Sequence, residues 1–284
     1  MPENYAHPEA IVETEWVAQR LSDPSILIAE INGDLNSAYH KGHIPAAVGW
    51  GLHSDFEHPV MRDIPSKEQL EGLLGRSGAD GNATVLLYGD GNNRTATWAF
   101  WVLRYYGHKD TRIINGGRKK WLDEGRPLST DIPKRKTKTY IARNPTKSLR
   151  ATKDYIVRHL GQPGISILDT RALEEYQGLL TSAPGTRQPD IERKGRIPGA
   201  IHLPWDEGAT STGAFKPAGE LKRMYLAKSI TPDKEVIPYC RLGVRASYSW
   251  FVLKYLLGYP KVRNYDGSWT EWGNAVGVPI ERDK

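Results

Sequence analysis

The chain has 284 residues, of which 39% are hydrophobic and 25% charged, and it contains 9 Trp and 14 Tyr. This composition supports one large or two modest folded domains and excludes a mainly disordered chain. A single cysteine excludes an intrachain disulfide and a zinc site built from several cysteines. The net charge of +6 suits an anionic substrate. We expect no nucleic-acid binding, because the densest basic run, residues 134–138, holds no aromatic side chain.

The start of the chain and its hydropathy predict a cytoplasmic protein. Residues 1–10 lack the cationic stretch followed by apolar residues that marks a secretory signal. No stretch approaches the ~18 uninterrupted apolar residues that a membrane-spanning helix needs. A lone cysteine also suits a reducing compartment. We therefore expect a cytoplasmic location without membrane contact.

The two halves of the chain repeat one another. The segment GHIPAA at residues 42–47 recurs as GRIPGA at 195–200. Further matches occur at one constant separation: Tyr88 with Tyr239, Arg94 with Arg245, Phe100 with Phe251, Gly107 with Gly258, Gly116 with Gly267 and Trp121 with Trp272. We therefore predict two copies of one domain, over residues 8–129 and 150–283. Residues 130–149 carry two prolines, many charges and no apolar period, which predicts a linker.

Each half alternates short apolar strands with amphipathic helices. Four apolar runs predict buried strands: residues 26–30, 85–88, 165–169 and 236–239. After the last of them, residues 246–257 place Trp250, Leu253 and Leu257 at helical spacing, and Gly258 is a natural helix end. Alternating strands and helices imply mostly parallel sheets with helices on both faces. The predicted fold class is α/β, in two similar units.

The only cysteine lies where a predicted strand turns into a helix. Cys240 opens the segment CRLGVR, residues 240–245. In parallel α/β sheets, ligands bind beyond the carboxyl ends of the strands, where unpaired amides and the dipole of the next helix favour negative charge. We predict a thiolate stabilised by Arg241, Arg245 and the helix start, rather than a cysteine buried among apolar side chains. Gly243 lets the backbone curl around it.

The equivalent loop of the first half lacks the thiol. Residues 89–94 read GDGNNR, with Gly89 in place of the cysteine and Asp90 in place of Arg241. We therefore expect the first half to be non-catalytic. A thiolate that attacks an electrophilic sulfur and expels a stable anion needs no base, which favours transfer of a sulfane sulfur through a persulfide. A phosphatase of the Cys-x5-Arg pattern is disfavoured, because its arginine would fall at Ala246.

These features together resemble the two-domain rhodaneses. The resemblance rests on both G-x-I-P-x-A segments, on YCRLGVR at 239–245 and on NYDGSW at 264–269, and it runs from about Val12 to Ile280. Such proteins are thiosulfate sulfurtransferases, with mercaptopyruvate sulfurtransferases as close relatives. The resemblance implies that Cys240 takes the outer sulfur of thiosulfate, releases sulfite and passes the sulfur to cyanide or a thiol. It implies neither a metal nor an organic cofactor.

The resemblance also implies roles for residues around the cysteine. The loop after it would bind the substrate and hold the persulfide: Arg241, Leu242, Gly243, Val244 and Arg245. Asp169 and Arg171 resemble a D-x-R strand end that ties the active loop to neighbouring turns, and Asp266 and Ser268 resemble a D-G-S turn near the site. Glu175 stands where some animal rhodaneses carry a substrate-binding cation. Anion binding should then depend more on the two loop arginines.

Several alternatives stay open at this point. Two arginines favour thiosulfate, a dianion, over mercaptopyruvate, which carries one carboxylate. A mercaptopyruvate sulfurtransferase and a non-enzymatic persulfide carrier remain alternatives, and the physiological acceptor is not fixed. An internal pair of domains suits a monomer. Pro238 lies in a predicted strand, where it removes a ladder donor, so the geometry of the following loop is also open.

Overall fold

The computed structural model describes residues 4–89, 91–182 and 191–283, which fall into two compact units. Unit 1 comprises Pro8–Thr146 and Ala209–Phe215. Unit 2 comprises Lys147–Gly208 with the described residues of 2–7 and 216–284. Residues 131–146 form neither helix nor strand and belong to unit 1, where the Lys138 amide donates to the Gly75 carbonyl.

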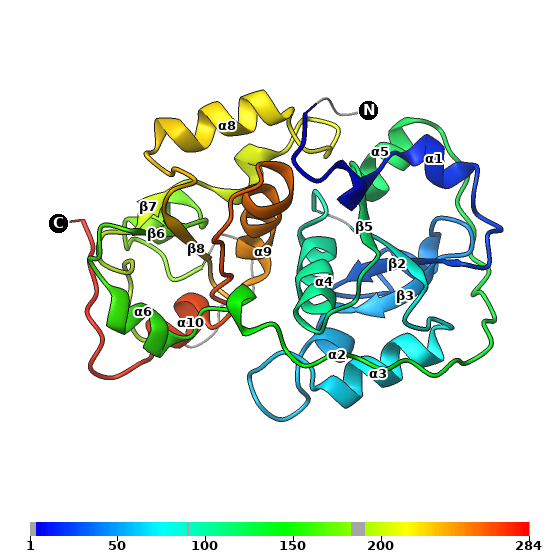
Figure 1. Cartoon of the computed structure of the whole chain (residues 1–284), viewed down its shortest axis with the longest axis horizontal. Coiled ribbons are helices and arrows are strands. Elements are labelled where there is room, and N and C mark those ends of the chain that lie inside the picture. The colour runs from blue at the N-terminus through cyan, green and yellow to red at the C-terminus, as the bar shows by residue number, and fades with distance from the viewer. Residues whose placement is uncertain (1–3, 90, 183–190, 284) are drawn as a thin grey trace. The chain divides into compact units, whose positions relative to one another are not determined.

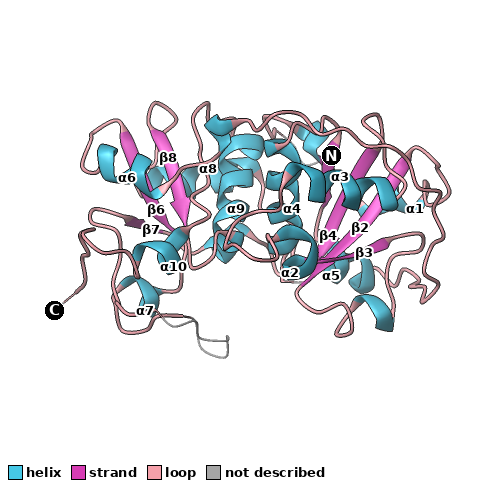
Figure 2. Cartoon of the chain, turned by 90° about the horizontal axis from the view of Figure 1, so that it is seen from below, coloured by secondary structure: helices cyan, strands magenta, loops and turns pink. Residues whose placement is uncertain are grey.

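Unit 1 alternates strands and helices around a parallel sheet. Its elements are β1 (Ile11–Val12), α1 (Thr14–Ala18), β2 (Ile26–Asn32), β3 (Val48–Gly51), α2 (Leu52–Phe56), α3 (Lys67–Arg76), β4 (Thr84–Gly89), α4 (Arg94–Tyr105), β5 (Thr111–Ile114) and α5 (Gly117–Asp123), with 3-10 turns at Pro8–Ala10 and Tyr39–Lys41. The strand order is β1-β5-β4-β2-β3, and each neighbouring pair is parallel. Figure 1 labels β2, β3 and β5 of this sheet. Helix α4 packs against β2, β4 and β5 (Figure 2). All of β2 is buried, as a central strand covered on both faces should be.

Unit 2 repeats this arrangement with a shorter sheet. Its elements are α6 (Lys153–His159), β6 (Ile165–Asp169), α7 (Leu173–Tyr176), β7 (Ile201–His202), α8 (Ala218–Ala227), β8 (Glu235–Tyr239), α9 (Val244–Phe251), a π-helical turn (Val252–Leu256) and α10 (Ser268–Trp272), with 3-10 turns at Lys147–Leu149 and Trp205–Gly208. The order is β7-β6-β8, and both pairs are parallel. Isolated parallel bridges add Val262 and Tyr265 beside β8, and Arg150 beside Asn264. These bridges occupy the places that β5 and β1 take in unit 1.

Pro238 accounts for the weaker pairing on the outer side of β8. On this side, the Val236 amide donates to the Lys261 carbonyl, and the Val236 carbonyl accepts the Arg263 amide. The carbonyl of Pro238 likewise accepts the amide of Tyr265 at 3.0 Å, but proline has no N–H to donate in return. β8 therefore forms in spite of Pro238, but the neighbouring segment with Val262 and Tyr265 makes isolated bridges instead of a full strand.

The predicted fold class is confirmed: both units are α/β, with parallel sheets and packed helices. All four predicted strands form, with ends shifted by at most two residues. The helix predicted over residues 246–257 is wrong in its ends. It begins at Val244 and changes into the π-helical turn after Phe251, which keeps Val252, Leu253 and Leu256 buried.

A buried carboxylate ties the strand ends of unit 1 together. Glu30 of β2 is buried, and it accepts the hydroxyl of Tyr88 at 2.6 Å and one guanidinium nitrogen of Arg118 at 2.9 and 3.1 Å. The Tyr88 oxygen accepts the Ile44 amide, and Arg118 donates to the Gly42 carbonyl. Burial and the charge of Glu30 raise the pKa of Tyr88. The G-x-I-P segment is thus fixed to β2 and β4.

Replacing Arg118 should destabilise unit 1 strongly. Arg118→Met leaves the carboxylate of Glu30 buried without its cation, a loss that costs about 3–5 kcal/mol. Arg112→Met is a matched control, since it breaks an ion pair with Asp110 that is only half-buried and is expected to cost about 1 kcal/mol or less. Urea unfolding of the two variants measures the difference, and equal midpoints would contradict this role for Arg118.

Candidate active site

Cys240 directly follows β8, and α9 begins at Val244. Gly243 precedes the helix with φ 89°, a left-handed conformation that favours glycine. Its amide donates to the Sγ atom of Cys240 at 3.1 Å. The sulfur therefore lies at the start of α9, where unpaired amides and the helix dipole favour negative charge.

The side chain of Cys240 is more buried than the sequence led us to expect, since the residue is 1% exposed. It lies at the end of a central strand, beneath the start of the helix that follows it. The sulfur nevertheless accepts a hydrogen bond from a backbone amide, so its surroundings are not purely apolar. Arg241, Leu242 and Val244 of the loop are half-buried and form the accessible side of this turn.

Ser268 holds the strand end from which the cysteine leaves. Its hydroxyl accepts the Cys240 amide at 3.0 Å and donates to the carbonyl of Tyr265 at 2.7 Å. The serine is buried and has φ 54°, an uncommon conformation for a residue with a side chain. One hydroxyl thus satisfies a buried donor and a buried acceptor at the base of the loop.

Unit 1 makes the same connection with a different residue. The amide of Gly89, the counterpart of Cys240, donates to the side chain of Asn93 at 3.1 Å, and Asn93 donates to the Ile114 carbonyl at 2.8 Å. The counterpart of Ser268 is Gly117, and a Cβ atom there would lie 2.2 Å from Asn93 Oδ1. The two arrangements are therefore mutually exclusive.

The loop of unit 1 also lacks space for a cysteine. A Cβ atom on Gly89 would lie 2.4 Å from Thr95 Oγ1 and 2.5 Å from the Ile31 carbonyl oxygen. Unit 2 has the smaller Ala246 where unit 1 has Thr95. Asp90, which replaces Arg241 in this loop, lies outside the described residues. The contrast between the two loops therefore extends beyond the missing thiol to the packing around it.

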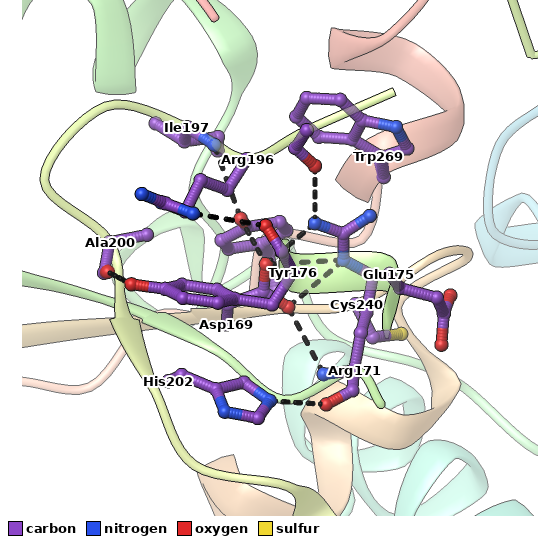
Figure 3. A network of polar contacts seen from close by, with 12 residues as sticks. Asp169, Arg171, Glu175, Tyr176, Arg196, Ile197, Ala200, His202, Cys240 and Trp269 are labelled. Carbon is purple, nitrogen blue, oxygen red and sulfur yellow. Dashed lines mark hydrogen bonds and ion pairs between the residues drawn. The ribbon is translucent and has the colours of Figure 1, made fainter. Parts of the chain in front are cut away.

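Asp169 and Arg171 form a buried ion pair beside the cysteine. Two nitrogens of Arg171 donate to Asp169 at 2.9 and 2.7 Å, and one of them also donates to the Gly195 carbonyl (Figure 3). Asp169 accepts the hydroxyl of Tyr239, whose oxygen accepts the Ile197 amide. Burial alone would lower the pKa of Arg171, but the charge of Asp169 reverses the effect and raises it. The network joins β6, β8 and the G-x-I-P segment.

The cation of this network comes from different positions in the two units. Arg118 of unit 1 corresponds in sequence to Trp269 of unit 2. The Arg171 guanidinium lies 4.7 Å from the centre of the Trp269 ring. Unit 1 has Asn32 two residues after its carboxylate, where unit 2 has Arg171. Both units thus neutralise a buried carboxylate, with the arginine carried by different segments.

Arg245 forms an ion pair with Glu175, and the sequence did not predict this pair. Its two terminal nitrogens donate to the two carboxylate oxygens at 2.7 and 2.8 Å. The Glu175 side chain is 0% exposed and that of Arg245 14% exposed. Burial would lower the pKa of Arg245, but the hydrogen bond to Glu175 and the charges of Cys240 and Glu175 raise it. The only hint of this pair in the sequence is that Glu175 is acidic although the resemblance places it near the predicted anion site.

The other predicted residues lie around the same turn. Asp266 accepts two hydrogen bonds from Arg150, at 2.8 and 2.7 Å, and so joins the segment before α6 to the segment before α10. The carbonyl of Arg241 accepts the hydroxyl of Thr270 at 2.8 Å. Within the described residues, no three His, Cys, Asp or Glu side chains cluster as metal ligands. No described helix is long and apolar enough to cross a membrane.

Comparison with known proteins assigns the family. The model of the rhodanese-like domain matches the chain twice, over residues 13–124 and 152–275. The chain belongs to the rhodanese family. It is a two-domain rhodanese-like protein, as the repeat and the motifs predicted, and it is therefore a member of a sulfurtransferase family.

Two kinds of name occur among its relatives. "Sulfur carrier protein TtuD" of Thermus thermophilus is 46% identical over 98% of each chain. "Putative thiosulfate sulfurtransferase" of Saccharopolyspora erythraea is 41% identical over 96% of each chain. The same name, with the suffix SseA, belongs to a Mycobacterium tuberculosis protein that is 42% identical over 97% of this chain and 92% of its own.

Solved structures of similar fold include an ergothioneine biosynthesis enzyme of Chlorobium limicola in complex with trimethyl histidine. It matches with a TM-score of 0.88 and 25% identity, over 99% of this rhodanese and 72% of its own chain. A variant of the EanB enzyme, with ergothioneine covalently linked to a cysteine persulfide, matches with a TM-score of 0.86 and 27% identity. It covers 97% of this chain and 70% of its own. The two-domain architecture therefore occurs within longer proteins.

Removing the hydroxyl of Ser268 should loosen the base of the loop. Ser268→Ala leaves the Cys240 amide and the Tyr265 carbonyl without this partner, and we expect a loss of about 1–3 kcal/mol in the free energy of unfolding. Ser229→Ala is the matched control, because Ser229 has a similar φ of 57° but is exposed. Urea unfolding should show a change of about 0.5 kcal/mol or less for the control. Equal losses would refute the anchoring role of the hydroxyl.

Proposed function

We propose that this rhodanese is a sulfurtransferase in which Cys240 accepts the outer sulfur of thiosulfate and passes it to cyanide or a thiol. The thiolate attacks the outer sulfur, the sulfur–sulfur bond of thiosulfate breaks, and sulfite leaves with the bonding electron pair. An acceptor anion then attacks the outer sulfur of the persulfide and returns Cys240 as the thiolate. Both steps are balanced without a metal, an oxidant or a reductant.

The position of the sulfur at the start of α9 is the observation that carries this proposal. A persulfide is one atom longer than the thiolate and carries its negative charge on the outer sulfur. The amide of Gly243 already donates to Sγ, and the neighbouring amides belong to the same helix start. Membership of the rhodanese family supports the same chemistry.

Persulfide formation should be visible directly. After incubation with thiosulfate and removal of excess reagent, intact-mass measurement should show the gain of one sulfur atom in the natural chain. Cyanide should remove it and yield thiocyanate over many cycles. Cys240→Ser should show neither the mass gain nor the thiocyanate, because serine cannot form a persulfide and no other cysteine is present.

A persulfide carrier is the second candidate, and the similarity to TtuD favours it. A carrier would gain the sulfur from thiosulfate but would not pass it to cyanide, because it would deliver the atom to a protein partner. Multiple turnovers with cyanide would therefore contradict the carrier proposal. A higher kcat/KM for mercaptopyruvate than for thiosulfate, under matched conditions, would contradict the preference for thiosulfate over mercaptopyruvate.

A further inference from the structure

The ion pair between Glu175 and Arg245 has no role in the steps proposed above. Its carboxylate is fully buried and binds both terminal nitrogens of the arginine, and Glu175 also accepts the amide of Ala172 at 3.1 Å. Figure 3 shows the Glu175 carboxylate and the Cys240 sulfur pointing to the same side of the Asp169–Arg171 pair. The charge of Cys240 also acts on Arg245. The carboxylate therefore holds an arginine that lies five residues after Cys240, at the start of α9.

The buried charged side chains near the sulfur form two ion pairs, each with one positive and one negative charge. Asp169 neutralises Arg171, and Glu175 neutralises Arg245. An incoming anion would have to compete with the Glu175 carboxylate for the same two nitrogens of Arg245. It would also meet the negative charge of that carboxylate, and this repulsion grows with the charge of the anion. A donor with two negative charges is penalised more than a donor with one.

We propose that Glu175 is a specificity-determining residue that makes the Cys240 site select monoanionic sulfane-sulfur donors over dianionic ones. This inference rests on the sulfurtransferase function proposed above. Thiosulfate remains a donor, but its second charge is a disadvantage here. Methanethiosulfonate is the matched monoanionic probe: the thiolate takes its outer sulfur, the sulfur–sulfur bond breaks, and methanesulfinate leaves with the electron pair.

The test is the ratio of kcat/KM for thiosulfate to that for methanethiosulfonate, measured at one ionic strength with cyanide as acceptor. Glu175→Gln keeps the size of the side chain, removes the charge and frees part of the arginine. We expect the ratio to rise by about tenfold or more, chiefly through a lower KM for thiosulfate. An unchanged ratio in an active Glu175→Gln variant would overturn the proposal.

Glu235→Gln is the matched control for this variant. Glu235 also pairs with an arginine, Arg263, and is only slightly exposed, but it lies at the other end of β8 from Cys240. Its replacement should leave the donor ratio unchanged. A ratio that rises equally in both variants would mean that loss of any ion pair has this effect, and it would also overturn the proposal.

Two further variants keep the proposal testable if Glu175→Gln folds poorly. Arg245→Gln alone leaves Glu175 uncompensated and should lower the donor ratio by about tenfold, whereas adding Glu175→Gln to it should restore the ratio toward that of the natural chain. If the double variant keeps the low ratio, Arg245 binds the donor itself and the proposal is wrong. A natural chain that forms no persulfide with either donor would instead overturn the proposed function.

Discussion

The buried pair of Asp169 and Arg171 fixes the place where the sulfur sits. Two fully buried charges cost several kcal/mol to desolvate, and they are tolerated only where geometry and hydrogen bonds compensate. Asp169 ends β6 and lies in register with Tyr239, which ends β8 and donates its hydroxyl to the carboxylate. Cys240 is the next residue. Its backbone is therefore attached to one of the most constrained points of unit 2, although its side chain belongs to a loop.

The two units satisfy the amide at the end of the strand with different residues, and this difference sets the cysteine-bearing loop of unit 2 apart from the loop of unit 1. Unit 1 satisfies the amide at the end of β4 with Asn93, a side chain from the loop itself. Unit 2 assigns this task to Ser268, which lies outside the loop. The side chains between Cys240 and α9 are then not needed to bind the amide at the end of β8. Their amides can face the sulfur, as that of Gly243 does.

Much of the fold followed from local patterns, whereas the electrostatic arrangement of the site did not. Apolar runs predicted the strands, and the repeat with its cysteine at a strand-to-helix turn pointed to the candidate site before α9. The partner of Arg245 could not be predicted in this way, because Glu175 lies far away in sequence and meets it only through the order β6-β8. The burial of Cys240 likewise depends on how α9 covers the strand end. Arg241 and Arg245 looked equivalent in sequence, but the fold assigns a carboxylate partner to Arg245.

That partner changes how binding at the site should be understood. If both loop arginines served only to attract anions, a buried glutamate on one of them would be a disadvantage. Stability does not explain the pair either, because apolar side chains of the same volume usually hold a buried position as well as an ion pair does. The ion pair instead fixes the guanidinium of Arg245 and neutralises its charge with that of Glu175. Binding of the donor then depends mainly on the oriented amides and the helix dipole, which stabilise the negative charge that develops on a sulfur atom. It depends less on a net positive charge, which would favour any small dianion.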